Sequence, residues 1–281
     1  MTDPASGATS GAAAVLAALL EARTGQQIAA TRAWRIDTAL RPLLAATGAE
    51  TVDALVAMLV ARSDPTLGDR IVDALLNQET SFFRDAGVID GAAAAIVEAA
   101  GERPGGRLRI WSAGCATGQE PLSLAMHFAE GGGPAPDIVA TDVSEGALAR
   151  ARAGRYSQFE IQRGLPVRRM MRWFDSVGGD WVAKPELVRT VSFRRQNLVA
   201  DPAPVGQFDA ILCRNVLFYL APTLRAKVLD RLAGALRPGG LLVLGAGETV
   251  IGQSELFRPS QRFRGLYELT VPVALPKAAA R

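Results

Sequence analysis

Three short stretches of the sequence end in residues that could hold a nucleoside. Residues Ala113–Gly118 follow an apolar segment, and their small side chains would let a ligand approach the backbone closely. Glu120 comes just after this loop, in what would be the first turn of a helix. Asp142 ends a second apolar segment, and Arg214 and Asn215 end a third. Together these residues offer carboxylates, a guanidinium and an amide to a polar ligand.

The pattern favours a nucleoside that carries no phosphate groups. Gly114 and Gly118 do not complete the G-x-G-x-x-G pattern of dinucleotide-binding loops, and the lysine of a phosphate-binding P-loop is missing. An acid at Asp142 can accept hydrogen bonds from both ribose hydroxyls, and Glu120 is placed to meet an ammonium group. S-adenosylmethionine has both features and is the commonest such cofactor of this kind of fold. An NAD-type ligand is the alternative interpretation.

The elements that must position these residues alternate between strand and helix. Such alternation predicts an α/β fold with parallel strands, right-handed crossovers and helices on both faces. Ligands of such sheets bind beyond the carboxyl ends of the strands, which is where the polar residues stand. The expected strands are residues 107–113, 137–143, 207–216 and 239–247, and the expected helices are 87–100, 119–130, 144–154 and 221–236.

The alternation lapses between Arg155 and Asn197. Residues 180–196 predict short antiparallel strands around Lys184-Pro185, so we interpret residues 155–196 as a small inserted β-subdomain. The segment 256–271 has the alternation of a hairpin.

The first part of the chain has a helical pattern instead. Residues 1–11 are small and polar, which predicts a disordered tail. From Ala12 to Gln78 apolar residues recur three and four apart, with turn residues between the periodic runs. We predict an N-terminal helical domain over residues 12–84 and a second domain over residues 85–281. The second predicted helix carries Arg32, Arg35 and Arg41, of which the first two share a face.

Composition excludes several classes of protein. The chain has 281 residues, of which 49% are hydrophobic, and its formal net charge is +3. It has no signal-peptide pattern and no apolar run long enough to cross a membrane, so we expect a soluble, cytoplasmic protein that is not inserted in a membrane. Cys115, Cys213 and His127 are too few and too scattered for a disulfide framework or a zinc site, so no metal is expected. No nucleic-acid-binding motif is present.

The stretch NQETSFFR, Asn77–Arg84, resembles the domain-junction signature of the chemotaxis receptor glutamate methyltransferases, the CheR family. Four further stretches resemble the cofactor motifs of that family and follow in the family's order. They are RIWSAGCATGQEPLSLAM, IVATDVSEGALARARAGRY, FDAILCRNVLFYL and LRPGGLLVLGAGE. The resemblance implies a helical N-terminal domain followed by a Rossmann-like class I methyltransferase domain with a small inserted antiparallel β-subdomain.

The resemblance also implies roles for individual residues. Gln78, Thr80 and Arg84 would lie over the methionine end of S-adenosylmethionine, and Asn197 and Leu198 would frame its adenine. Arg84 and Tyr219 would stand beside the transferred methyl as catalytic residues. The implied cofactor-binding residues are Gln78, Thr80, Arg84, Glu120, Asp142, Asn197, Leu198, Arg214 and Asn215.

The sequence departs from the family at a few positions. Gln78 replaces an asparagine, and Gly245–Glu248 stands where many members have Gly-His-Ser-Glu. The inserted sheet is shorter than the form that docks a receptor's C-terminal peptide, so binding of such a peptide stays an open question.

The implied reaction transfers a methyl group to receptor glutamates and leaves S-adenosylhomocysteine. A glutamate carboxylate has a reference pKa of about 4.3 and is ionised at neutral pH, so the enzyme needs no general base. Arg84 could orient the carboxylate, and the alternative for Arg84 is a salt bridge between domains. The run after Cys213 lacks the Asn/Asp-Pro-Pro-Tyr/Phe pattern of many nitrogen methyltransferases.

The implied partners are methyl-accepting chemoreceptors, whose cytoplasmic domains are acidic coiled coils. Arg32, Arg35 and Arg41 could dock on such a surface, and an ordinary solvated helix face is the alternative. A monomer is expected for a modifier that diffuses between receptors. Two other functions remain open: methylation of a different protein or small acid by the same fold, and a cofactor-binding signalling partner without turnover.

Overall fold

The structure is a computed structural model that describes residues 10–28, 34–101, 107–132 and 135–270. The contacts within the chain divide it into two compact units. The first comprises Met1–Gln78 together with Tyr219–Ala221, and the second comprises Glu79–Phe218 and Pro222–Arg281.

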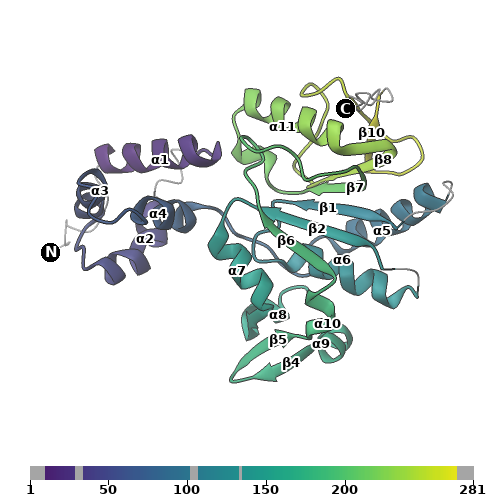
Figure 1. The fold of residues 1–281 in the computed structure, drawn as a ribbon, viewed down its shortest axis with the longest axis horizontal. Coiled ribbons are helices and arrows are strands. Elements are labelled where there is room, and N and C mark those ends of the chain that lie inside the picture. The colour runs from purple at the N-terminus through teal and green to yellow at the C-terminus, as the bar shows by residue number, and fades with distance from the viewer. Residues whose placement is uncertain (1–9, 29–33, 102–106, 133–134, 271–281) are drawn as a thin grey trace, which may run out of the picture. The chain divides into compact units, whose positions relative to one another are not determined.

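Helices build the described part of the first unit (Figure 1). Leu16, Leu20, Ile36 and Leu40 are buried, as the spacing of three and four residues requires of a core-facing stripe. The helices are α1 (Ser10–Thr24), α2 (Trp34–Thr47), α3 (Val52–Val60) and α4 (Leu67–Leu75). α1 starts inside the predicted tail because the alanine-rich run that follows favours helix from its first residue. The rest of that tail, residues 1–9, lies outside the described residues.

A short piece from far along the chain completes the first unit. The Gln27 N–H donates to the Tyr219 carbonyl over 2.8 Å, and Gln26 forms an isolated antiparallel bridge with Leu220. The side-chain amide of Asn77 donates to the Tyr219 hydroxyl. Tyr219 is therefore held by residues that precede it by more than a hundred positions.

A seven-stranded sheet forms the centre of the second unit, in the order β6-β2-β1-β7-β8-β10-β9. The strands are β1 (Arg109–Ala113), β2 (Asp137–Asp142), β6 (Val191–Arg195), β7 (Phe208–Cys213), β8 (Leu236–Leu244), β9 (Phe257–Pro259) and β10 (Tyr267–Leu269). The first five strands of that order pair in parallel, and β10 pairs antiparallel with both β8 and β9. The predicted α/β architecture and the C-terminal hairpin are confirmed. The strand order reverses between β1 and β7, which is where ligands of such sheets bind.

Helices cover both faces of this sheet, which explains why β1, β2 and β7 are nearly continuous apolar runs. Ile110, Ile138 and Ala210 share one buried cluster with residues of α5 (Ala86–Gly101) and α6 (Gln119–Glu130). On β1 the next residue, Trp111, faces the opposite side, where it lies near α11 (Pro222–Ala235). α7 (Glu145–Ala153) packs beside β2 and β6.

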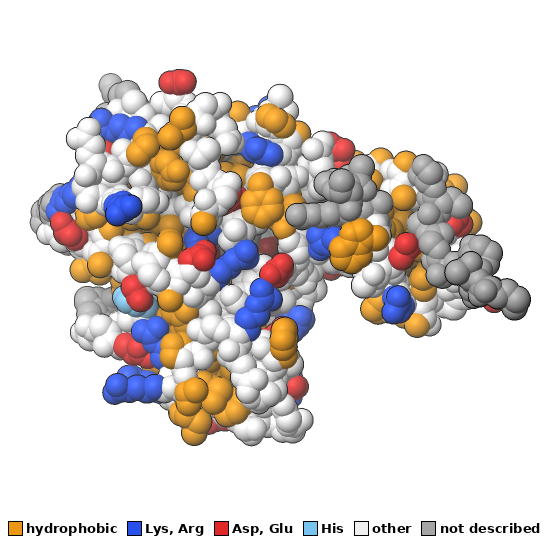
Figure 2. Space-filling model, turned by 180° about the vertical axis from the view of Figure 1, so that it is seen from behind, with side chains coloured by type: hydrophobic (Ala, Val, Ile, Leu, Met, Phe, Trp, Pro, Cys, Tyr) orange, Lys and Arg blue, Asp and Glu red, His pale blue; other side chains and the backbone are white. Residues whose placement is uncertain are grey.

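A separate three-stranded antiparallel sheet follows α7, in the order β3-β5-β4. Its strands are β3 (Arg155–Ser157), β4 (Phe174–Val177) and β5 (Asp180–Ala183), and its helices are α8 (Gln158–Gln162), α9 (Val167–Trp173) and α10 (Pro185–Val188). The inserted antiparallel sheet expected from the sequence is thus present. Figure 2 shows hydrophobic side chains at the lower end of the second unit. The exposed large hydrophobic residues of α8 and α9 are Phe159, Val167 and Met171.

One strand assignment from the sequence was wrong. Val191–Arg195 was expected in the small sheet, but it forms β6, which pairs in parallel with β2 at the edge of the large sheet. The chain between β5 and β6 forms the short helix α10, with Pro185 in its first turn. Alternating burial marks a strand but does not say which sheet it joins, because the partner strand is chosen by tertiary packing.

No single helix among the described residues has both the length and the hydropathy of a membrane span. The pair α2 and α3 meets those criteria only when taken together across a bend of 64°.

Gly164 lies where a side chain would collide with the main chain. Its φ is +90°, and a Cβ built on it would lie 2.1 Å from the Phe82 carbonyl oxygen. Gly179 has a φ of +88°, and a Cβ built on it would meet nothing within 4 Å. Gly179→Ala therefore measures the backbone cost alone, about 1–2 kcal/mol of unfolding free energy. Gly164→Ala adds the collision and should lose about 1–3 kcal/mol more. Urea denaturation of the two variants measures the difference, and equal losses would show that the Phe82 contact is absent in solution.

Candidate active site

A tight loop joins β1 to α6 at the sheet edge where the strand order reverses. Gly114 and Gly118 adopt φ values of +83° and +94°, a region that residues with a Cβ rarely occupy. A Cβ on Gly114 would lie 2.5 Å from Val216, and one on Gly118 would lie 2.8 Å from the Ala151 side chain. The two glycines are required both by the backbone conformation and by the close packing of neighbouring elements against the loop.

Asp142, at the end of β2, is fixed beside this loop by main-chain donors. Its Oδ2 accepts the Ala116 N–H over 2.8 Å, and its Oδ1 accepts the Ser144 N–H over 2.9 Å. From the side of the small sheet, the Tyr156 hydroxyl donates to the Thr117 carbonyl over 2.9 Å. Burial raises the pKa of Tyr156, which keeps this phenol a neutral donor. The loop and the carboxylate are therefore held in one fixed arrangement.

Glu120 and Arg214 form the centre of a buried ionic network. The Ser112 hydroxyl donates to Glu120 Oε1 over 2.7 Å, and Arg214 Nη1 lies 3.1 Å from Glu120 Oε2. Arg214 Nη2 donates to an Asp85 carboxylate oxygen over 2.7 Å and to the Arg84 carbonyl over 3.0 Å. The Arg214 side chain is 2% exposed and that of Glu120 14% exposed, so water screens this pair little.

The segment that carries Arg84 is strained and tightly held. Phe83 and Asp85, on either side of it, have φ values of +47° and +54°, which are costly for residues other than glycine. Phe82 is fully buried, and the Phe83 N–H donates to the Ser123 hydroxyl on α6 over 3.0 Å. With its carbonyl on Arg214, the Arg84 main chain has little freedom to move.

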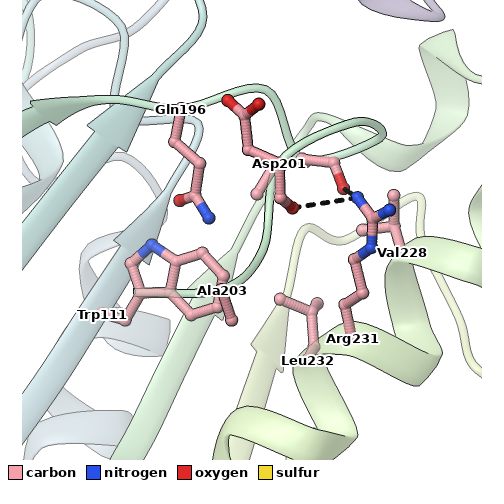
Figure 3. A pocket seen from close by; sticks show the side chains of 8 residues that line it. Trp111, Gln196, Asp201, Ala203, Val228, Arg231 and Leu232 are labelled. Atoms are coloured by element: carbon pink, nitrogen blue, oxygen red, sulfur yellow. Dashed lines mark hydrogen bonds between the residues drawn. The ribbon is translucent and has the colours of Figure 1, made fainter. Parts of the chain in front are cut away.

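Asn197 and Leu198 lie in the turn after β6. Asn197 Oδ1 accepts the Val199 N–H over 2.9 Å, and the Leu198 carbonyl accepts Arg231 Nη1 of α11 over 2.8 Å. Leu198 is one of the residues that line a small pocket, in which Trp111 of β1 lies across from Val228, Arg231 and Leu232 of α11 (Figure 3).

The structure brings together only some of the residues predicted from the sequence. Glu120, Asp142, Arg214, Asn215 and the main chain of Arg84 meet at one edge of the sheet in the second unit. Gln78 and Tyr219 belong to the first unit. There the Gln78 side-chain amide donates to the Asp73 carbonyl over 3.1 Å. Thr80 is half-buried and precedes the strained segment.

The predicted docking arginines have different environments. Arg35 Nη2 donates to Asn77 Oδ1 over 3.2 Å and is partly buried. Arg41 is exposed in the middle of α2. Arg32 lies outside the described residues.

Sequence reasoning gave no role to Ser112, Asp85 and Glu248. Ser112 and Asp85 belong to the Glu120–Arg214 network, and Glu248 holds the loop that contains Asn215. Asp85 follows Arg84 directly, and Glu248 ends the last cofactor motif, so position in the motifs was the available signal.

The two cysteines of the chain are not suited to nucleophilic chemistry. Burial raises the pKa of the Cys115 and Cys213 thiols well above the ordinary value, and both are free, buried cysteines, as predicted. His127 is in the last turn of α6, with its Nδ1 3.1 Å from an Asp90 carboxylate oxygen. The site therefore offers binding and orientation of groups rather than an activated nucleophile.

Comparison with known proteins identifies the family of the chain. The family model described as "CheR methyltransferase, SAM binding domain" matches residues 78–265, which is most of the chain. The chain belongs to the CheR methyltransferase family. It is an S-adenosylmethionine-dependent methyltransferase, and the cofactor predicted from the sequence is confirmed.

Individual relatives agree with the family. The chain is 34% identical over 256 residues to the chemotaxis protein methyltransferase Cher2 of Pseudomonas putida. The matched residues make up 88% of this chain and 93% of that protein. It is 36% identical over 240 residues to chemotaxis protein methyltransferase 1 of Pseudomonas aeruginosa, which covers 82% of this chain and 87% of the relative. Among solved structures, a sugar N-methyltransferase from Streptoalloteichus is 18% identical with a TM-score of 0.35, over 57% of this chain and 48% of that one.

The residues of this CheR-family site fit S-adenosylmethionine. One guanidinium, Arg214, stands among two carboxylates, Glu120 and Asp85, so the network carries a net charge of 1 − 2 = −1. That charge suits a cofactor whose sulfonium and ammonium outweigh its carboxylate. Arg214 Nε is buried and has no hydrogen-bond partner among the described residues, so it is a donor that a ligand carboxylate could use. Asp142 ends β2, the strand next to β1, at the carboxyl edge of the sheet where ligands of such folds bind.

The network predicts a large loss of stability when its cation is removed. Arg214→Met leaves the Glu120 carboxylate buried without a counter-charge, and unfolding free energy should fall by about 3–5 kcal/mol. Adding Glu120→Gln should recover part of that loss, because the unpaired charge is then gone. Arg155→Met removes an exposed pair with Asp180 and should cost no more than about 1 kcal/mol. Urea unfolding measures wild type, Arg214→Met, Glu120→Gln, the double variant and Arg155→Met, and a double-variant loss equal to the sum of the Arg214→Met and Glu120→Gln losses would contradict the buried ion pair.

Proposed function

We propose that this methyltransferase esterifies glutamate side chains of methyl-accepting chemoreceptors, giving γ-glutamyl methyl esters and S-adenosylhomocysteine. The relatives named chemotaxis protein methyltransferases support the pathway. The observation that carries the proposal is the way in which the chain holds Arg84: its carbonyl accepts from Arg214, the cation of the network that contains Glu120, and its neighbours Phe83 and Asp85 both have positive φ. The Arg84 side chain extends from this held segment, where its Nη1 donates to the Glu79 carbonyl over 3.3 Å, and its positive charge suits an anionic acceptor.

A carboxylate acceptor needs no general base. A glutamate side chain is ionised at neutral pH and can attack directly, whereas an alcohol or an amide nitrogen would need a proton acceptor. Cys115 and Cys213 are buried thiols of raised pKa, and His127 pairs with Asp90. The carboxylates of the site, Glu120, Asp85 and Asp142, are engaged in ion pairs and hydrogen bonds, which suits a substrate that brings its own nucleophile.

Arg84 and Tyr219 are the residues assigned to the acceptor. The Arg84 guanidinium would hold the glutamate oxygens by charge-assisted hydrogen bonds and orient one of them toward the methyl group. The Tyr219 hydroxyl, which accepts from the Asn77 amide, would form a polar wall beside the reacting atoms. The Arg84 carbonyl accepts from Arg214, and the Tyr219 carbonyl accepts from the Gln27 N–H, so the main chain at each residue is held within its own unit.

The remaining residues are assigned to the cofactor. When bound, S-adenosylmethionine supplies a methyl group on a sulfonium sulfur, which keeps the electron pair of the broken bond and becomes a neutral thioether. Glu120 and Arg214 would hold its amino-acid end by their opposite charges. Asp142 would accept from the ribose, and Asn197 and Leu198 would border the adenine. Gln78, Thr80 and Asn215 complete the proposed set.

Two other functions remain as alternatives. The same site could methylate a carboxylate of a different protein or of a small acid, since Arg84 would recognise any such group. A regulator that binds the cofactor without turnover is also compatible with the fold. The acceptor and the turnover, rather than cofactor binding, distinguish these functions.

Receptor labelling tests the proposal directly. Membranes that contain the organism's own chemoreceptors are incubated with the enzyme and methyl-labelled S-adenosylmethionine, and the labelled proteins are then exposed to mild alkali. We expect receptor label that alkali releases, because carboxyl methyl esters hydrolyse readily. Arg84→Ala should lower this labelling by about a hundredfold or more, while the Kd for S-adenosylhomocysteine changes by less than about tenfold.

Arg258→Ala is the control, because Arg258 forms an exposed pair with Glu268 away from the proposed site. It should leave labelling unchanged. Cofactor binding without receptor label would contradict the proposed substrate and favour a different carboxylate acceptor. Full receptor labelling by Arg84→Ala would instead remove Arg84 from the reaction.

Docking on the receptor is proposed for the basic face of the first unit. Arg41 is exposed on α2, whereas Arg35 is partly buried against Asn77, so Arg41 is better suited to meet an acidic partner. Attraction between the two surfaces would raise the association rate and would weaken as salt increases.

A single charge reversal tests this docking. Arg41→Glu should raise the KM for receptor membranes several-fold at low salt. The methylation rate of this variant should also depend less on salt than the wild-type rate does. The same change at the exposed Arg62, which lies between α3 and α4, alters net charge equally and should have a smaller effect. A KM for Arg41→Glu that matches the wild-type value at both low and high salt would rule out docking through α2.

A further inference from the structure

Glu248, in the loop after β8, gathers four main-chain donors on its two carboxylate oxygens. Oε1 accepts the N–H groups of Val216 and Leu217 over 2.8 and 2.7 Å. Oε2 accepts the N–H groups of Asn215 and Gly245 over 2.7 and 2.8 Å. Three of the four donors are consecutive residues of the loop after β7, and the whole set lies within the second unit. Converging N–H groups of this kind normally bind an anion, and here the anion is a side chain.

The loop that Glu248 holds is under strain and touches the glycine loop. Asn215 has a φ of +60°, in the left-handed region, which asparagine enters more readily than other non-glycine residues but less readily than glycine. The next residue, Val216, packs closely on Gly114: a Cβ built on Gly114 would lie 2.5 Å from a Val216 methyl group. The residue before Asn215 is Arg214, the cation of the buried network. A shift of this loop would therefore disturb Arg214, Asn215 and the Gly114 turn together.

We propose that Glu248 is a positioning residue for S-adenosylmethionine: its carboxylate holds the 215–217 loop in the strained conformation that completes the cofactor site. Glu248 acts through the main chain of this loop. This role uses the acid of the Gly245–Glu248 motif and does not depend on which acceptor is methylated.

The chemistry of the contact requires a carboxylate of this length. Four N–H donors need four acceptor positions, which two ionised oxygens provide. In Glu248→Gln one oxygen becomes an NH₂ group, so two donors face another donor and remain unsatisfied. In Glu248→Asp the charge is kept but the side chain is one methylene shorter, so it can serve only part of the set.

The first measurement is binding of S-adenosylhomocysteine by calorimetry. Glu248→Gln should raise its Kd by about tenfold or more, because unsatisfied donors release the loop. The Kd of Glu248→Asp for S-adenosylhomocysteine should lie between the values of Glu248→Gln and wild type. Glu268→Gln is the matched control: Glu268 is a partly buried acid on β10 that pairs with Arg258, and its Kd should stay at the wild-type value. A role in global stability alone would lower the melting temperature and leave the Kd of the folded protein unchanged.

A second pair of variants disturbs the same contact without removing the acid. A Cβ on Gly245 would lie 2.8 Å from Glu248 Oε2 and 2.9 Å from the Asn215 nitrogen, whereas one on Gly247 would meet nothing within 4 Å. Gly245→Ala should therefore weaken S-adenosylhomocysteine binding as Glu248→Gln does, and Gly247→Ala should not. If Glu248→Gln does not fold, this pair decides the question.

Hydrogen exchange of the ligand-free protein reports on the loop itself. The amides of Asn215, Val216 and Leu217 should exchange faster in Gly245→Ala and Glu248→Gln than in wild type. A wild-type Kd together with faster exchange would overturn the proposal, because the loop would then be free to move without affecting the cofactor. A wild-type Kd with unchanged exchange would overturn it as well. All these readouts use the cofactor product or no ligand, so a failure of the receptor proposal would leave them intact.

Discussion

The buried guanidinium of Arg214 is the contact on which the arrangement of the site depends. It joins the end of β7 to the first turn of α6 through Glu120 and to the segment before α5 through Asp85 and the Arg84 carbonyl. In a medium of low dielectric constant such a cation is costly unless it is fully paired, and so are its carboxylate partners. Each of these segments is consequently held in place by the others. A small shift of one segment would separate Arg214 from a carboxylate partner and leave both charges unpaired.

Backbone strain is concentrated at the same edge of the sheet. The described non-glycine residues of the second unit that have positive φ are Phe83, Asp85, Ala116 and Asn215. Each such conformation costs on the order of 1–3 kcal/mol and persists only where the surroundings determine it. Asp85 is held by a bond from Arg214, the Ala116 N–H by Asp142, and the Asn215 N–H by Glu248. Ionic side chains thus stabilise three of these conformations, and the Ser123 hydroxyl accepts the N–H of the fourth residue, Phe83.

This distribution fits the demands of methyl transfer to a carboxylate, the acceptor proposed above. Such an acceptor supplies the nucleophile and the cofactor supplies the leaving group, so little proton transfer is asked of the protein. What remains is alignment, and alignment benefits from loops that do not move. The buried thiols of Cys115 and Cys213 and the neutral Tyr156 contribute packing and hydrogen bonds rather than chemistry.

The sequence by itself determined the class of fold, the cofactor and the residues at the strand ends. Apolar runs of the length of β1, β2 and β7 require burial on both faces, and polar residues directly after parallel strands must meet at one edge. The sequence could not assign Val191–Arg195 to the large sheet, nor show that Asp85 and Ser112 join Glu120, because partners distant in the chain are selected only when the elements pack. It also left Glu248 without a role. Main-chain amides are the same in every residue, so their convergence on one carboxylate is decided by tertiary structure alone.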